Sequence, residues 1–366
     1  MKAWKNISVL LATVPLVLSA CSSAATSAPA ASVAPASVAP SAAASAAVAG
    51  PSFAVKQPPF TIGVSNISTA NPWRVQMDTE AKYFAQQNPD LIKSLLVVDA
   101  NDDINKQISD VEDFIAKKVD LIVIAPATPD GVNGAIAEAV AAGIPVVSWN
   151  NSTTSPLVPY QYASPYYDYA KIQAAWLAQQ MGGKGNVIGL RGIAGASVDS
   201  DEWRAFTEMM TANPGIKVIC QEYASWDYGQ AKTAVANCLA NHPDVNGVLS
   251  IGDSMTWAAA EALITGNYDV SKIPMVGIGA GNGPLKFFAS HPQIPVNIIP
   301  DRTDQVVSAL KGGISLLQGQ PVGSIYIPAV VITQANIAQF AKPSMPDMVW
   351  LGTSLPDSVL QEQAPK

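Results

Sequence analysis

Short apolar runs alternate with amphipathic segments along most of the chain. Leu121–Ile124 is an uninterrupted apolar run rich in β-branched side chains, which is typical of a strand buried on both faces of a parallel sheet. Ile104, Ile108, Val111 and Ile115 recur at helical spacing, so they indicate the buried face of a helix. The two kinds of segment follow one another in turn, and this alternation predicts an α/β fold.

The predicted strands are short and mostly apolar, and the predicted helices fill the segments between them. Strands are expected at Phe60–Ser65, Leu95–Val98, Leu121–Ile124, Ile144–Ser148, Asn186–Leu190, Ile216–Cys220, Gly247–Ile251, Ile273–Ile278, Val296–Ile299 and Ser324–Ile332. Helices are expected at Pro72–Gln87, Ile104–Ile115, Val132–Ala142, Tyr169–Met181, Glu202–Met210, Gln230–Leu239, Met255–Leu263 and Thr303–Leu317. Parallel sheets with helices on both faces and right-handed crossovers accommodate this order.

The pattern occurs twice. Val119–Ile124, a helix and Ile144–Val147 correspond to Val245–Ile251, a helix and Ile273–Val276. A body of roughly 300 residues is also larger than one comfortable hydrophobic core and suggests two domains of about 150 residues each. We therefore expect two similar lobes, each a doubly wound, Rossmann-like parallel sheet.

The first twenty residues have the pattern of an export signal. Lys2 and Lys5 precede an apolar run from Ile7 to Leu18, and small residues lead into Cys21. This run is too short for a membrane-spanning helix and is typical of a secretory signal. The Leu-Ser-Ala-Cys sequence resembles a bacterial lipoprotein box, in which the Cys is acylated after cleavage. An ordinary signal peptide that contains a Cys is the alternative.

Residues 21–57 consist almost entirely of Ala, Ser, Pro and Val, with no charge before Lys56. Such small side chains bury little apolar area, so we expect a disordered tether. The sequence thus predicts an extracytoplasmic protein, anchored to a membrane by a lipid on Cys21, at a cell surface or in a periplasm.

Charge and cysteine content narrow the class of partner. The chain has 21 basic and 28 acidic residues. Loss of Lys2 and Lys5 with the signal leaves 19 basic against 28 acidic residues, a net charge of −9. The absence of any Lys/Arg cluster argues against a nucleic-acid partner. Cys220 and Cys238 form either a disulfide, which an oxidising compartment permits, or two buried thiols.

Polar and aromatic residues follow the ends of the predicted strands, where open α/β sheets bind ligands. Amides, carboxylates and an Arg suit the hydroxyls of a sugar, and an indole ring suits its apolar face. The candidates found in this way are Ser65, Asn71, Trp73, Arg74, Asn150, Asn151, Trp226, Asp253, Asn282 and Asp301.

Sequence signatures of catalysis are missing. His242 and His291 fall in predicted loops, and the chain has neither a G-x-S-x-G elbow, nor a Walker loop, nor Cys/His zinc spacing. We therefore predict a binding protein without a metal or cofactor. An exported enzyme acting on a sugar or nucleoside is the alternative, with Glu202 and Asp301 as the available acid and base.

Several stretches together resemble the type I solute-binding proteins of bacterial ABC transporters, in particular the ribose/galactofuranose-binding group. The order and spacing of the stretches carry the resemblance, which runs from about Phe60 to Thr333. They are Gly63–Ser65, Asn71–Arg74, Val119–Pro126, Ile144–Val147, Gly192–Ser197, Trp226–Asp227 and His242–Val248.

The resemblance implies two lobes joined by a three-stranded hinge, with the ligand in a cleft between them. Lobe 1 would comprise residues 58–163 and 302–327, and lobe 2 residues 164–301 and 328–366. It implies a monomer that closes on a small ligand and delivers it to an ABC transporter permease. A module that presents ligand to a membrane receptor is a further alternative.

The resemblance also adds Glu202 to the candidate ligand-binding residues. This chain has Asn150-Asn151 where the family usually has Asp-Arg, Glu202 where it has Arg, and Gly279 where it has Asp. The resulting acidic surplus leaves open a different pentose or hexose, a polyol, or a ligand bearing an amine.

Overall fold

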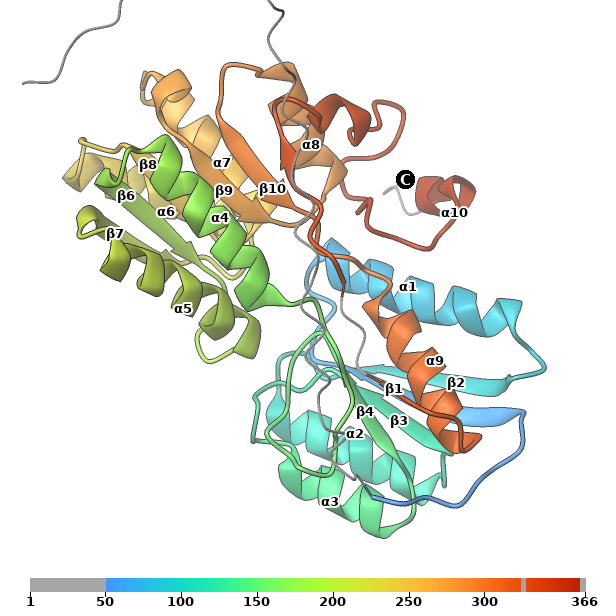
Figure 1. Cartoon of the computed structure of the whole chain (residues 1–366). Helices are drawn as coiled ribbons and strands as arrows, with labels where there is room; N and C mark the ends of the chain where they lie inside the picture. The colour runs from blue at the N-terminus through green and yellow to red at the C-terminus, as the bar shows by residue number, and fades with distance from the viewer. Residues whose placement is uncertain (1–50, 324–326, 363–366) are drawn as a thin grey trace, which may run out of the picture. The chain divides into compact units, whose positions relative to one another are not determined.

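A computed structural model describes residues 51–323 and 327–362 of the chain (Figure 1). The predicted signal peptide, the predicted lipidation site Cys21 and most of the predicted tether lie outside these residues. Among the helices described, none is long and apolar enough to cross a membrane.

The first lobe is built on a parallel sheet with strand order β2-β1-β3-β4-β5. Helices α2 and α3 cover one face, and α1 and α9 cover the other (Figure 1). The strands are β1 (Phe60–Asn66), β2 (Ile92–Asp99), β3 (Leu121–Ile124), β4 (Val146–Trp149) and β5 (Gln161–Tyr162). The helices are α1 (Pro72–Gln87), α2 (Ile104–Ala116), α3 (Asn133–Ala141) and α9 (Gln305–Leu317).

The second lobe has strand order β11-β10-β9-β8-β6-β7, parallel except for the edge pair β10–β11. Helices α4 and α5 pack together, as do α6, α7 and α8. The strands are β6 (Lys184–Arg191), β7 (Gly215–Tyr223), β8 (Gly247–Ser250), β9 (Met275–Ile278), β10 (Val296–Ile299) and β11 (Ile332–Thr333). The helices are α4 (Tyr166–Gln180), α5 (Ser197–Ala212), α6 (Tyr228–Asn241), α7 (Asp253–Thr265) and α8 (Asn282–Ser290), with the 3₁₀ turn η1 (Val270–Lys272).

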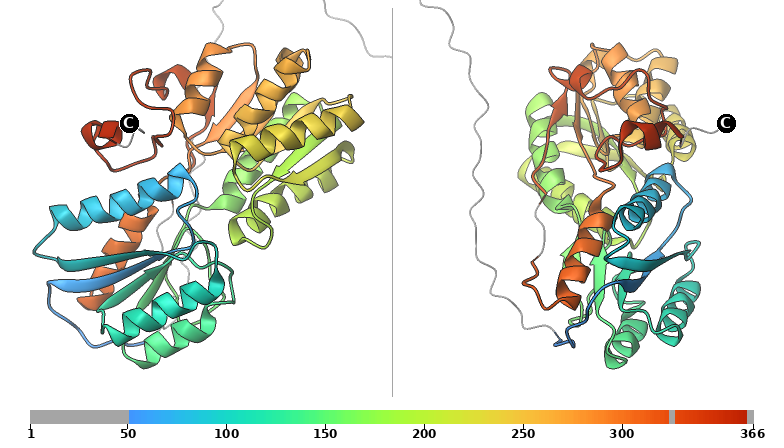
Figure 2. Two further views of the ribbon diagram at one scale, coloured as in Figure 1. Left: turned by 180° about the vertical axis from the view of Figure 1, so that it is seen from behind. Right: turned by 90° about the vertical axis from the view of Figure 1, so that its right-hand side faces the viewer.

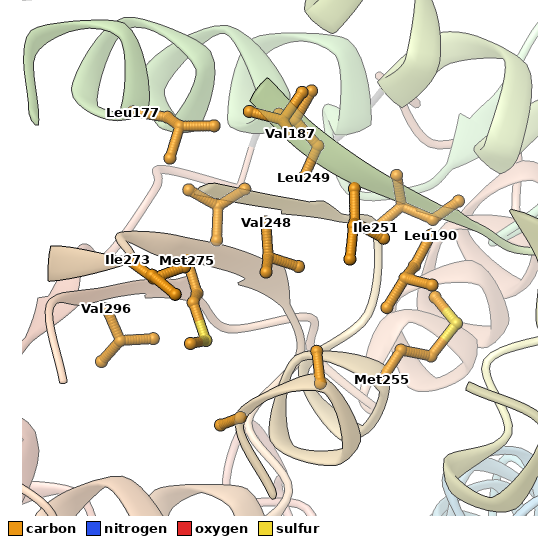
Figure 3. Packing of buried hydrophobic residues seen from close by; sticks show 14 of the residues in the cluster. Leu177, Val187, Leu190, Val248, Leu249, Ile251, Met255, Ile273, Met275 and Val296 are labelled. Atoms are coloured by element: carbon orange, nitrogen blue, oxygen red, sulfur yellow. The ribbon is translucent and has the colours of Figure 1, made fainter. Parts of the chain in front are cut away.

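Apolar side chains from both faces of the second sheet form its core. Val248 and Leu249 are adjacent in β8 and completely buried. Figure 3 shows them between Leu177 of α4 and Met255 of α7. A strand that is buried on both faces needs apolar residues at every position, which explains why β8 and β3 are continuous apolar runs in the sequence.

The chain passes between the two sheets three times. The passages lie between β5 and α4, between β10 and α9, and between α9 and β11. The predicted fold class of two doubly wound α/β lobes is therefore confirmed. Cys220 of β7 and Cys238 of α6 form a disulfide, with their Cα atoms 5.8 Å apart.

Several predicted elements are wrong. Of the strand expected at Ser324–Ile332, residues 324–326 lie outside the described residues, and among the rest only Ile332 is in a strand, the two-residue β11. Helix α5 begins at Ser197, five residues earlier than predicted, and α8 was not predicted, because its first turn contains glycine and Pro284. Lys56 falls near the end of the predicted tether of residues 21–57 and contacts the first lobe. Lys56 donates its backbone N–H to Leu317 and pairs with Asp120 at 2.9 Å.

The C-terminal segment follows β11 through the 3₁₀ turn η2 (Ile337–Gln339) and ends with helix α10 (Asp357–Glu362). Figure 2 shows this segment in red beside α1. Val349 and Leu360 form a small apolar cluster with Tyr83 of α1. On the other side, the backbone of Val349 accepts a hydrogen bond from Asn282 N at 2.8 Å. The segment thus contacts helices from both lobes.

Candidate ligand-binding site

Arg74 is held at the start of α1 by its local sequence. Asn71 caps the helix, with its side chain accepting from Arg74 N at 3.0 Å, and Pro72 occupies the first turn, where it costs no backbone hydrogen bond. The Arg74 guanidinium donates to amide oxygens of Asn66 (3.1 Å), Asn150 (2.9 Å) and Asn151 (3.4 Å). Burial lowers the pKa of Arg74.

Asn150 connects this guanidinium to the second lobe. It follows β4 and has φ of 59°, a left-handed conformation that Asn adopts more readily than most residues. Its side-chain N–H donates to the hydroxyl of Tyr166, the first residue of α4. Nearby, Ser152 N donates to Ser197 Oγ at the start of α5 with a length of 3.1 Å.

Asp301 lies on the passage from β10 to α9 and accepts hydrogen bonds from neutral donors. These are Ser164 Oγ at 2.8 Å, Gln305 Nε2 at 2.8 Å and the Tyr166 hydroxyl at 3.1 Å. Burial raises the pKa of Asp301 to about 7, against the opposing effect of these bonds and of Arg74. Burial, followed by the charge of Asp301, raises the pKa of Tyr166 well above its usual value. Arg74, Asn150, Tyr166 and Asp301 therefore form a continuous hydrogen-bonded chain.

Asp253 begins α7, directly beyond the end of β8. Its carboxylate accepts from Gly281 N at 2.8 Å, and burial raises its pKa to about 7. Gly279 has φ of 150°, and a Cβ at that position would lie 2.3 Å from the Asp253 carboxyl carbon. The carboxyl group of Asp253 thus occupies the space that a side chain at position 279 would need.

Glu202 is a buried acid in α5, with 1% of its surface exposed. Its Oε2 atom is buried and has no hydrogen-bond partner among the described residues. Burial raises the pKa of Glu202 well above its usual value, and the charge of Asp301 is the next largest cause.

Three predicted site residues use their side chains in contacts within one part of the fold. Ser65 is buried and accepts from Gln107, and Asn71 caps α1. The amide of Asn282 bonds to backbone groups of the C-terminal segment at Lys342 and Met345, so it is a structural residue.

The indole rings of Trp73 and Trp226, both predicted to contact the ligand, pack against or bond to other parts of the protein. Trp73 is 8% exposed, stands edge-on to Trp350 at 6.4 Å between ring centres, and donates to the Asp301 backbone oxygen at 3.3 Å. It is a packed residue because the C-terminal segment, whose path was not predicted, covers it. Trp226 is half-buried and donates to Ile251 O at 3.1 Å.

Sequence reasoning missed Tyr166, Ser164 and Gln305 as members of this polar network. Tyr166 and Ser164 stand at the first passage between the sheets, and Gln305 follows Asp301 by four residues, so their positions beside the hinge were the available signal. Within the described residues, Cys220, Glu222 and Cys238 are grouped closely enough to bind a metal, but the disulfide removes both thiolates.

Comparison with known proteins agrees with this architecture. Residues 62–321 match the family described as periplasmic binding protein domain. The ribose import binding protein of Bacillus subtilis is 30% identical over 229 residues, which cover 63% of this chain and 73% of that protein. The xylitol-binding protein of Mycolicibacterium smegmatis is 26% identical over 72% of this chain and 73% of its own length.

Among solved structures, an ABC transporter solute-binding protein from Mycobacterium smegmatis with bound glycerol has a TM-score of 0.71 and 25% identity. The similarity covers 78% of this chain and 98% of that one. These relatives are named as binding proteins, in agreement with the prediction that the chain is not an enzyme, and the family implies an extracytoplasmic location. The chain therefore belongs to the periplasmic binding protein family, in the type I group that includes the ribose-binding proteins.

Proposed function

We propose that this protein captures a small polyhydroxylated ligand, a sugar or polyol, and delivers it to the permease of an ABC importer. The observation that carries the proposal is the hydrogen-bonded chain from Arg74 through Asn150 and Tyr166 to Asp301, which joins residues of both lobes. The printed names of the ribose- and xylitol-binding relatives support the ligand class.

Arg74 and the buried acids take opposite hydrogen-bonding roles toward a ligand. The guanidinium of Arg74 donates to ligand oxygens, and the carboxylates of Asp301 and Asp253 accept from ligand hydroxyls. A ligand that bonds to both lobes favours the closed arrangement because those bonds are complete only there. We propose Arg74, Asn150, Asn151, Glu202, Asp253 and Asp301 as ligand-binding residues, with Trp226 at their edge.

A ligand screen by thermal unfolding tests the proposal. A ligand at a hundredfold excess over its dissociation constant stabilises the folded state by about 2.7 kcal/mol, so a true ligand raises the Tm clearly. Pentoses, hexoses and polyols form the panel, and isothermal calorimetry gives the Kd of each that responds. A flat response across the panel contradicts the proposal.

A variant pair connects the binding to the site. Arg74→Gln removes charge-assisted hydrogen bonds worth about 1.5–3 kcal/mol, so we expect the Kd to rise by about tenfold or more. Arg204→Gln makes the same change at an exposed position of α5 and is expected to leave the Kd unaltered. Equal affinity in both variants would remove Arg74 from the site.

We further propose that the mature protein is a monomer held to the membrane by a lipid on Cys21. The lipoprotein-like sequence before this residue and the Ala/Ser/Pro-rich stretch after it support an anchor followed by a tether.

A further inference from the structure

Carboxyl groups outnumber cations at the proposed site. Glu202, Asp253 and Asp301 come from α5, from α7 and from the passage after β10. These follow strands β6, β8 and β10 of the second sheet, in which β6 and β8 are adjacent and β9 separates β8 from β10. The carboxyl ends of parallel strands lie at one edge of a sheet, which brings the three acids toward a common point.

The charge of Arg74 lowers the pKa of Asp301, but no cation among the described residues forms an ion pair with any of the three acids. In the described part of the chain, Arg74 bonds to amide oxygens and forms an ion pair with no carboxylate. Arg191 pairs with Asp199, and Arg302 pairs with Asp304.

The hydrogen bonds already present bring no positive charge to the three acids. Among the described residues, Asp301 accepts from hydroxyls and an amide, and Asp253 accepts from the backbone N–H of Gly281 and the hydroxyl of Ser254, all of them neutral donors. Neutral donors satisfy lone pairs but supply no positive charge.

The buried, unpaired carboxyl oxygen of Glu202 is independent evidence for a ligand group that donates hydrogen bonds at this place. Its Oε2 atom is buried without a partner within the described residues, and its carboxyl group is close enough to Asp301 and Tyr166 for the three to affect one another electrostatically. A buried carboxyl oxygen without a hydrogen-bond partner costs about 1–3 kcal/mol, so it calls for a donor that the described residues do not supply.

A protonated amine supplies both the positive charge that the three acids lack and a hydrogen-bond donor for the unpaired oxygen of Glu202. It brings three N–H donors and a full positive charge to one atom, whereas a hydroxyl brings one donor and no charge. We infer that the ligand of this protein carries a protonated amine on a polyhydroxylated frame, bound by Glu202 together with Asp253 and Asp301. This inference rests on the proposed function and specifies its ligand class.

Matched pairs of ligands test the inference by calorimetry. The pairs are glucose with glucosamine, and myo-inositol with an aminodeoxyinositol, and N-acetylglucosamine serves as the bulky neutral control. At about pH 6.5 such amines are mostly protonated. We expect an amine to bind at least about tenfold more tightly than its parent alcohol, a difference of 1.4 kcal/mol.

The variant Glu202→Gln keeps the shape of the side chain and removes its charge. We expect it to abolish the tenfold preference for the amine over its parent alcohol, and far-UV circular dichroism shows whether the variant is folded. Glu208→Gln removes an exposed charge from the same helix and should keep the wild-type preference.

The outcomes separate this inference from the proposed function. A parent alcohol that binds wild-type protein as tightly as its amine overturns the inference and leaves the sugar- or polyol-binding function intact. The same holds if the preference survives in Glu202→Gln. No binding by any ligand of the full panel overturns the proposed function, and the inference with it.

Discussion

At the scale of single residues, the fully buried carboxyl group of Asp253 links the site to pH. Its pKa is raised from 3.8 to about 7, mainly by burial, although bonds from Gly281 and Ser254 favour the charged form. Between these two pH values the group is protonated in the folded protein and ionised in the unfolded chain. The folded state therefore binds more protons there, and the free energy of unfolding decreases as the pH rises from about 4 to 7.

Replacing Asp253 by Asn removes this contribution and retains an oxygen that accepts from Gly281 N. We expect wild type and variant to have similar stability near pH 4, and the variant to become the more stable one as the pH rises to 7. The difference should grow by at most about 1.4 kcal/mol per pH unit. Urea unfolding of the ligand-free proteins across this range measures it. Parallel pH profiles would show that Asp253 titrates normally.

Residues that follow strand ends were the predictable part of the polar network between the lobes. Arg74, Asn150 and Asp301 belong to one hydrogen-bonded chain because the carboxyl ends of parallel strands gather at one edge. Trp73 and Asn282 also follow strand ends, yet their side chains contact the C-terminal segment: Trp73 packs against Trp350, and Asn282 donates to Lys342 O. Position relative to a strand is local information, whereas the partner of a side chain depends on segments far away in the sequence.

At the scale of elements, α1 was predicted with both of its ends. Pro72 and the Asn71 cap mark its start, and these signals are local. Helix α8 was missed because Gly283 and Pro284 resemble a loop, although a proline in the first helical turn is compatible with a helix. The two-residue strand β11 has too few residues to show an alternating pattern.

Glu80 attaches the C-terminal segment to α1. Its buried carboxylate accepts from the hydroxyls of Thr303, Thr353 and Ser354, and from Ser354 N at 3.2 Å. Glu80→Ala leaves these donors without an acceptor, so we expect the free energy of unfolding to fall by about 1–3 kcal/mol. Hydrogen exchange of residues 345–355 should accelerate as well.

The exposed Glu112 of α2 provides the matched control, and Glu112→Ala is expected to change neither quantity. Slow exchange of residues 345–355 in Glu80→Ala would mean that apolar contacts, such as those of Val349 and Leu360, hold the segment without this carboxylate.

The disulfide between Cys220 and Cys238 connects β7, at the edge of the second sheet, to helix α6. A bond that closes a loop of this size restricts the unfolded chain and stabilises the protein by about 3 kcal/mol in the loop-entropy description. We expect the double variant Cys220→Ser, Cys238→Ser to lose about this amount in urea unfolding. Dithiothreitol should destabilise wild type and leave the variant unaffected; equal sensitivity of the two would indicate free thiols.

At the scale of the whole molecule, the repeated βαβ pattern predicted two lobes, and the family confirms this architecture. The contacts that the C-terminal segment makes with both lobes were not predictable. The backbone N–H of Trp350 bonds to Gln76, 274 residues earlier in the chain, while Leu351 N bonds to Ala280 in the second lobe. Contacts between such distant positions follow from the assembled fold and leave no periodic signal in either segment.

The final prediction concerns where the whole molecule resides. The proposed membrane anchor is a lipid on Cys21. Each CH₂ group of an acyl chain contributes about 0.8 kcal/mol when it enters the bilayer, and loss of the chain removes this energy entirely. We expect Cys21→Ser to move the protein from the membrane pellet to the soluble extracytoplasmic fraction, with its Tm and ligand affinity unchanged. Cys220→Ser with Cys238→Ser should remain in the pellet. If Cys21→Ser stays with the membrane, an uncleaved apolar segment from Ile7 to Leu18, and no lipid, is the anchor.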